Sequence, residues 1–158
     1  MPKSKIRSLT IILVLVLAVA VTPAFAKKIG PHGGRPLYAK LAGANEVPGP
    51  GDADGMGSVL LTLNQGQGEI CFQIQVTNLT LPPTGSHIHA GAAGVAGVVV
   101  VDLAASYDAN GYASGCVTGL EKATIKAIRQ HPKDYYVNVH TVDYPAGAVR
   151  GQLSKKNK

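Results

Sequence analysis

The sequence lacks an apolar stretch long enough to cross a membrane. Its longest uninterrupted apolar run, Ile11–Val21, covers 11 residues, whereas a membrane-spanning helix needs about 20. The run follows a basic start and precedes the small-residue segment Ala24-Phe25-Ala26, which is the order of a cleavable signal peptide. We therefore predict that residues 1–26 are a signal peptide and that the rest of the chain is secreted or periplasmic, with no transmembrane segment.

Cysteine is also scarce, with two in the chain. Cys71 and Cys116 are 45 residues apart, which is not the spacing of a CxxC redox pair or of a zinc site. An exported protein with an even number of cysteines usually oxidises them. We predict one disulfide between Cys71 and Cys116, which in the chain-entropy model stabilises the fold by about 4 kcal/mol.

Motifs of hydrolases and of nucleotide-binding proteins are missing. The sequence contains no Gly-x-Ser-x-Gly elbow, and a disulfide would leave no free thiol to act as a nucleophile. The Gly-rich segment 91–97 lacks the Lys and the Ser or Thr of a phosphate-binding loop. We interpret this segment as a turn between two strands.

Positive charge is concentrated at the two ends of the chain. The formal net charge is +6, but residues 37–153 contain six Lys or Arg against nine Asp or Glu. A mildly acidic domain argues against nucleic-acid binding. We predict a flexible leader over residues 27–36, one domain over residues 37–153 and a basic tail over residues 154–158. The basic ends are either solvated or in contact with acidic surface polymers or lipid headgroups.

Apolar residues alternate with polar ones at a period of two, which is typical of half-buried strands. The clearest case is the segment 70–77, where Ile70, Phe72, Ile74 and Val76 alternate with Cys, Gln and Thr. About eight such segments follow one another, near residues 37–41, 59–63, 70–77, 86–90, 97–103, 113–117, 134–141 and 148–153. We predict an all-β fold: an antiparallel Greek-key β-sandwich or barrel, immunoglobulin-like or superoxide-dismutase-like.

One segment has a helical pattern instead. Thr118-Gly119-Leu120-Glu121 fits a capping box, and Ala127 and Ile128 then fall on one helical face before His131-Pro132 ends it. We predict one short helix near residues 119–130.

Three histidines form the main candidate site. His87 and His89 occupy positions i and i+2 of one predicted strand, so their side chains point to the same face. His140 shares a face with Asn138 in a later strand. If the two strands approach each other, three imidazoles can surround one copper or zinc ion and leave an open position. The alternative interpretation is that all three are hydrogen-bonded structural residues.

Glu46 and Arg150 are charged residues within otherwise apolar or Gly-rich strand ends. We interpret each as part of a buried or edge ion pair in preference to a catalytic group.

The order of motifs resembles that of the CHRD domain, the module named after chordin. The resemblance rests on Glu46-Val47-Pro48, His87-Ile88-His89 with the glycines after it, Gly115-Cys116-Val117, Tyr135–Thr141 and Arg150–Leu153. It covers about residues 37–153 and implies an extracellular β-sandwich module with a Cys71–Cys116 bridge and no established reaction. Growth-factor antagonism does not carry over, because this chain has none of chordin's cysteine-rich repeats.

The chain is also similar, in the order of a few residues, to copper/zinc superoxide dismutases. Carried over by position, that likeness implies that His87, His89 and His140 bind copper and that Arg150 attracts an anion. The bridging histidine and the zinc cluster of those enzymes are missing here. The sequence therefore predicts an exported binding or structural module with a candidate three-His metal site and an unknown extracellular or envelope partner. The alternatives are a copper-only superoxide-dismutase-like enzyme and a metal storage or delivery protein.

Overall fold

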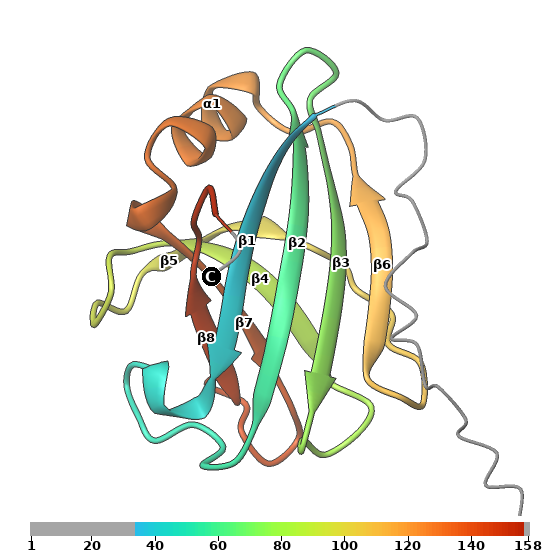
Figure 1. Ribbon diagram of the computed structural model, residues 1–158, viewed down its shortest axis with the longest axis vertical. Coiled ribbons are helices and arrows are strands. Elements are labelled where there is room, and N and C mark those ends of the chain that lie inside the picture. The colour runs from blue at the N-terminus through green and yellow to red at the C-terminus, as the bar shows by residue number, and fades with distance from the viewer. Residues whose placement is uncertain (1–33, 157–158) are drawn as a thin grey trace, which may run out of the picture.

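The computed structural model describes residues 34–156, and the predicted signal peptide lies outside this range. The described residues form eight strands and one α-helix (Figure 1). The strands are β1 (Arg35–Ala42), β2 (Met56–Asn64), β3 (Glu69–Thr77), β4 (Gly85–Ala90), β5 (Val98–Asp102), β6 (Tyr112–Val117), β7 (Tyr135–His140) and β8 (Val149–Gln152). The helix is α1 (Lys122–Gln130), and two 3-10 turns are η1 (Gly43–Asn45) and η2 (Pro132–Asp134). The all-β prediction is confirmed.

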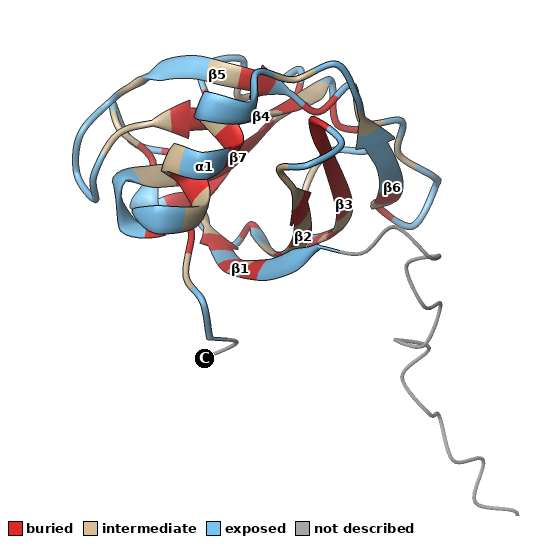
Figure 2. Ribbon diagram, turned by 90° about the horizontal axis from the view of Figure 1, so that it is seen from above, coloured by how far each residue is buried: buried red, intermediate tan, exposed pale blue. Residues whose placement is uncertain are grey.

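The strands follow one another in the order β5-β4-β7-β8-β1-β2-β3-β6, and every neighbouring pair is antiparallel. The junction between β8 and β1 is short, with one paired position, Ala42 with Arg150, and a further bridge from Tyr38 to Ser154. It therefore divides the strands into two four-stranded layers. Seen from above, β1, β2 and β3 lie opposite β4, β5 and β7, and both layers carry buried residues (Figure 2). The result is a nearly closed barrel or sandwich.

The core follows from the period-two pattern. In β3, Ile70, Phe72, Ile74 and Val76 are all buried, as the alternation predicts. They pack in one cluster with apolar residues of the other strands, and full burial of each such side chain contributes about 1.5–3 kcal/mol. Burial of these side chains between the strands therefore holds the two layers together.

The predicted disulfide is present between the edge strand β6 and its neighbour β3. Cys71 of β3 lies directly opposite Cys116 of β6, and their sulfur atoms are bonded. The bridge therefore attaches the edge strand β6 to the layer.

The helix begins later than the sequence pattern predicts, and the predicted capping box is wrong. Gly119 has φ +73, which no right-handed helix accommodates, so the chain turns there. Glu121 takes the N-cap position without a side-chain hydrogen bond. The buried face consists of Ile125 and Ile128, which close one end of the barrel.

The sheet also extends past both predicted domain boundaries. β1 begins at Arg35, inside the predicted leader, and Ser154 exchanges two backbone hydrogen bonds with Tyr38. None of the helices within residues 34–156 has the length and apolar character that crossing a membrane requires.

Candidate metal site

The pairing of β4 with β7 brings the three predicted histidines together. His87 and His89 lie on β4 on either side of Ile88, which is fully buried. In the register between the strands, Gly85 is opposite His140, so His140 is diagonal to His87. One ring nitrogen from each histidine lies within 4.8 Å of the other two. The approach of the two strands, on which the site depends, is therefore observed.

Two of the histidines are oriented by backbone carbonyl groups. Nδ1 of His89 lies 2.9 Å from the oxygen of Gly97, and Nδ1 of His140 lies 3.1 Å from the oxygen of Pro145. A carbonyl oxygen only accepts hydrogen bonds, so each Nδ1 must carry the proton. Each Nε2 therefore has a lone pair in place of a proton, which is the arrangement that metal-binding histidines use in other proteins.

The Nε2 atom of His89 is the most informative atom of the site. The residue is 8% exposed, and within residues 34–156 this nitrogen has no hydrogen-bond partner. A buried polar atom without a partner costs about 1–3 kcal/mol. A metal ion would satisfy the lone pair where the described residues do not.

His87 completes the group from the other side. Its Nδ1 lies 3.0 Å from Nε2 of His140, and its Nε2 lies 4.0 Å from a carboxylate oxygen of Asp102. The first nitrogen thus faces the group, while the second faces an acceptor that can orient the ring. Oδ1 of the buried Asn138 also lies 3.1 Å from Nε2 of His140.

Burial favours the neutral form of two of these imidazoles, because it lowers the pKa of each. Desolvation is the main effect that lowers the pKa of His87, and the neighbouring His89 lowers this pKa further while Asp102 opposes both. Desolvation likewise lowers the pKa of His140, with further contributions from His87 and His89 against the Pro145 carbonyl. Neutral imidazole is the form that binds metal ions.

Two stacked side chains, Tyr136 and Arg150, support the His89 ring. The ring of Tyr136 stacks on the imidazole of His89, with centroids 4.7 Å apart. The guanidinium carbon of Arg150 lies 3.4 Å from the centroid of the Tyr136 ring. Nη2 of Arg150 donates hydrogen bonds of 2.9 Å to the carbonyl oxygens of Ala92 and Val95. Arg150 therefore holds the loop of residues 91–97, whose last residue orients His89.

The position of Arg150 differs from the one that an anion-guiding role requires. The residue is 1% exposed and lies behind Tyr136, so its charge does not reach the surface. Glu46 is its charged neighbour: burial raises the Glu46 pKa to about 7, and the Arg150 charge opposes this shift. Both residues are buried, but within residues 34–156 they form no ion pair with each other, so the predicted ion pair is not observed. Sequence reasoning also missed the contact of Arg150 with Tyr136.

Comparison with known proteins adds the family. The CHRD domain family model matches residues 37–153. The chain belongs to the CHRD family. Comparison with curated proteins and with solved structures found no match for this chain.

The three-His group of this CHRD domain is open on one side. A hollow of about 390 Å³ is lined by His87, His140, Asp102 and Pro145, among others. His89 is not part of this lining and closes the site from the interior. An ion bound to the three nitrogens would thus have a free coordination position facing solvent, as metal sites with three protein ligands do.

Proposed function

We propose that this CHRD protein is exported and serves as a binding or structural module that holds one copper or zinc ion through His87, His89 and His140. The observation that carries the proposal is the buried, unpartnered Nε2 of His89, which belongs to a group of three converging imidazoles. A purely structural role would leave this lone pair without a function.

The donor set favours copper or zinc over other biological cations. Three neutral imidazoles suit copper and zinc, whereas calcium and magnesium prefer carboxylate, carbonyl and water oxygens. Between the two, the Irving–Williams order favours Cu²⁺ at equal availability. A bound ion would supply a Lewis acid or, in the case of copper, a redox centre. The protein's own groups would orient the ligands through Gly97, Pro145 and Asp102.

A copper-only, superoxide-dismutase-like enzyme is the second candidate, and the solvent-facing hollow favours it. The charges at the hollow argue for binding instead. The side chain of Asp102 is 70% exposed beside His87, so its negative charge would repel an anionic substrate. The cation of Arg150 is buried and does not offset this charge at the mouth. A metal storage or delivery protein would use the same three-His site but would catalyse no reaction there.

Export rests on the order of residues 1–26 and on the Cys71–Cys116 disulfide. Disulfides of this kind persist in oxidising compartments. The first residues match the basic, apolar and small-residue order of a signal peptide.

The metal proposal is tested by titrating the purified, disulfide-bonded protein with Cu²⁺ and with Zn²⁺, followed by elemental analysis. We expect one ion per chain in the wild type and its loss in the variant H87A/H89A. The matched control is H131A, because His131 is exposed and outside the three-His group. Equal uptake by the wild type and H87A/H89A, or no uptake by the folded wild type, would overturn the proposal. A superoxide dismutation assay on the loaded protein then separates the enzyme from the storage or structural module.

A further inference from the structure

Most positive charge of the described residues lies at one end of the barrel. Residues 34–156 contain nine Lys or Arg, and seven of these are on α1, on η2, at the start of β1 or just after β8. The other two are Lys40 and the buried Arg150. The described part of the chain has as many Asp and Glu as Lys and Arg, so the concentration of cations reflects their placement and not an excess of charge.

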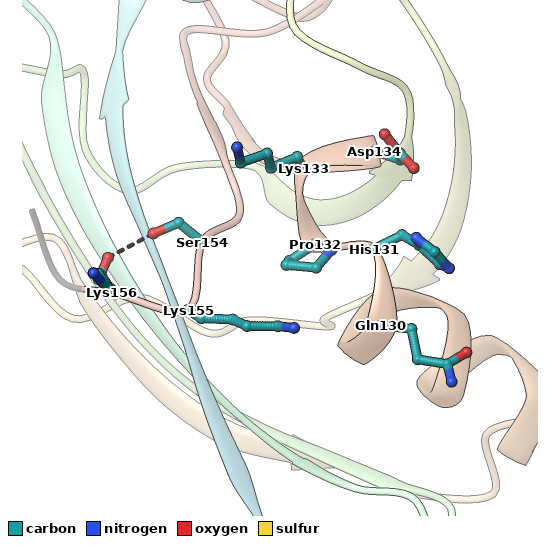
Figure 3. A pocket seen from close by; sticks show the side chains of 8 residues that line it. All are labelled: Gln130, His131, Pro132, Lys133, Asp134, Ser154, Lys155 and Lys156. Carbon is teal, nitrogen blue, oxygen red and sulfur yellow. Dashed lines mark hydrogen bonds between the residues drawn. The ribbon is translucent and has the colours of Figure 1, made fainter.

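These cations line a groove between α1 and the C-terminal residues. Two hollows, each of about 540 Å³, share Gln130, His131 and Lys155 and are therefore adjacent. Figure 3 shows the first hollow, where Lys133 and Lys155 project from separate segments. The whole groove is lined by five Lys or Arg, namely Arg35, Arg129, Lys133, Lys155 and Lys156, against one acidic residue, Asp134.

The cations of the groove are not neutralised within the part of the chain that the structure describes. None of the five is paired there with a carboxylate, and Arg129 donates to the neutral amide of Gln65. Four of the five side chains are exposed. Clustered cations in a concave surface raise the local concentration of anions.

We propose that this groove binds a linear polymer of repeated phosphate groups at the cell surface. Lysine binds phosphate as a point charge, and the cations are spread along two hollows, which suits a chain of anions better than one small ion. The groove also fits a polymer better than a bilayer. The exposed large apolar residues of the described chain, which would insert into lipid, lie outside its lining.

The proposal is independent of the metal site, because none of the three histidines lines the groove. Binding should depend strongly on salt, since each neutralised phosphate releases a counterion. For five contacts to a flexible polyanion, we expect affinity to fall on the order of 100-fold between about 50 and 200 mM salt.

The test measures binding of fluorescently labelled inorganic polyphosphate to the purified protein by anisotropy. The groove variant K133Q/K155Q and the control variant K40E lower the net charge by the same amount, and Lys40 is exposed on β1 outside the groove. We expect K133Q/K155Q to bind about 10-fold or more weakly and K40E to bind like the wild type.

Four results would overturn the proposal. The first is the absence of saturable binding at low salt, and the second is an equal loss in both variants, which would reflect net charge alone. The third is full competition by orthophosphate at the same phosphate concentration, which would indicate a single-ion site. The fourth is tighter binding to phosphatidylglycerol vesicles with the same dependence on Lys133 and Lys155, which would indicate a lipid surface.

Discussion

The imidazole of His89 and the phenol ring of Tyr136 are stacked, with 9° between their planes. This contact connects the three-His group to Arg150 and the loop of residues 91–97, because the guanidinium of Arg150 lies over the Tyr136 ring and donates to that loop. The orientation of one proposed ligand thus depends on residues that never reach the group itself.

Replacing Tyr136 should therefore weaken metal binding without removing a ligand. In Y136L the stacking surface and the hydroxyl contact with the Gly97 amide are both lost, so we expect the affinity for Cu²⁺ to fall about 10-fold, as for other outer-shell changes. Y136F keeps the ring and serves as the matched control. Competition titration against a chelator measures the Cu²⁺ affinity of each variant. Equal affinities of Y136L and the wild type would contradict the role of the stack.

Arg150 should contribute to stability although it forms no ion pair within residues 34–156. The variant R150M leaves the carbonyl oxygens of Ala92 and Val95 without their donor and leaves Glu46 buried without a nearby cation. We expect a loss of about 3–5 kcal/mol in the free energy of unfolding, because two carbonyl oxygens lose their charged donor and the cation–π contact with Tyr136 is lost. Urea denaturation checks this value. A loss below about 1 kcal/mol, typical of exposed positions, would show that the guanidinium is not needed inside.

Glu46 should make stability depend on pH. Burial raises its pKa from 4.5 to about 7 in the folded protein, so between these values the folded state binds more protons than the unfolded state. The stability contributed by this group is therefore present below about pH 4.5 and is lost as the pH rises through about 7. E46Q has no such proton, so its stability relative to the wild type should increase from about pH 5 to about pH 8. Urea denaturation at several pH values measures the difference, and a constant difference would contradict the raised pKa.

The disulfide should stabilise the edge of the barrel. Cys71 and Cys116 are 45 residues apart in the sequence and join β3 to β6, so we expect C71A/C116A to lose about 2–4 kcal/mol of unfolding free energy. Because β6 is an edge strand, hydrogen exchange should rise first in β6. If hydrogen exchange in β6 and the midpoint of urea denaturation were both unchanged in C71A/C116A, strand pairing alone would hold this edge.

Export should be visible in the mass of the protein recovered outside the cytoplasm. We expect its N-terminus at Lys27, after Ala24-Phe25-Ala26, because small residues at these positions suit signal peptidase. Intact mass spectrometry decides the matter. Recovery of the full-length chain from the cytoplasm alone would contradict the export proposal.

The histidine group illustrates what the sequence can and cannot predict. The common face of His87 and His89 follows from the period of a strand, and the position of Ile88 in the core confirms it. The approach of His140 depends on the pairing of β4 with β7, which are separated by β5, β6 and α1 in the chain. Pairing between distant strands is set by the packing of the whole core. The sequence therefore predicted the three-His group only on the condition that the two strands are neighbours.

Arg150 and the helix show the limits more clearly. A charged residue next to glycines predicts a buried or edge charge, but its contact with Tyr136 arises because Asn138, two residues after Tyr136, is opposite Arg150 in the β7–β8 register. The helix begins later than predicted because Gly119 adopts a left-handed conformation. The capping-box pattern in the sequence does not reveal that conformation. Local patterns identified the elements here, and tertiary contacts decided their ends and roles.

The most direct measurement of the central claim is pulsed electron paramagnetic resonance of the protein loaded with one equivalent of Cu²⁺, which counts coordinated imidazole nitrogens. The account predicts three imidazole ligands in the wild type and in H131A, and two in H89A. A wild-type spectrum without three coordinated imidazoles, or an H89A spectrum identical to the wild type, would contradict a copper site built on His87, His89 and His140.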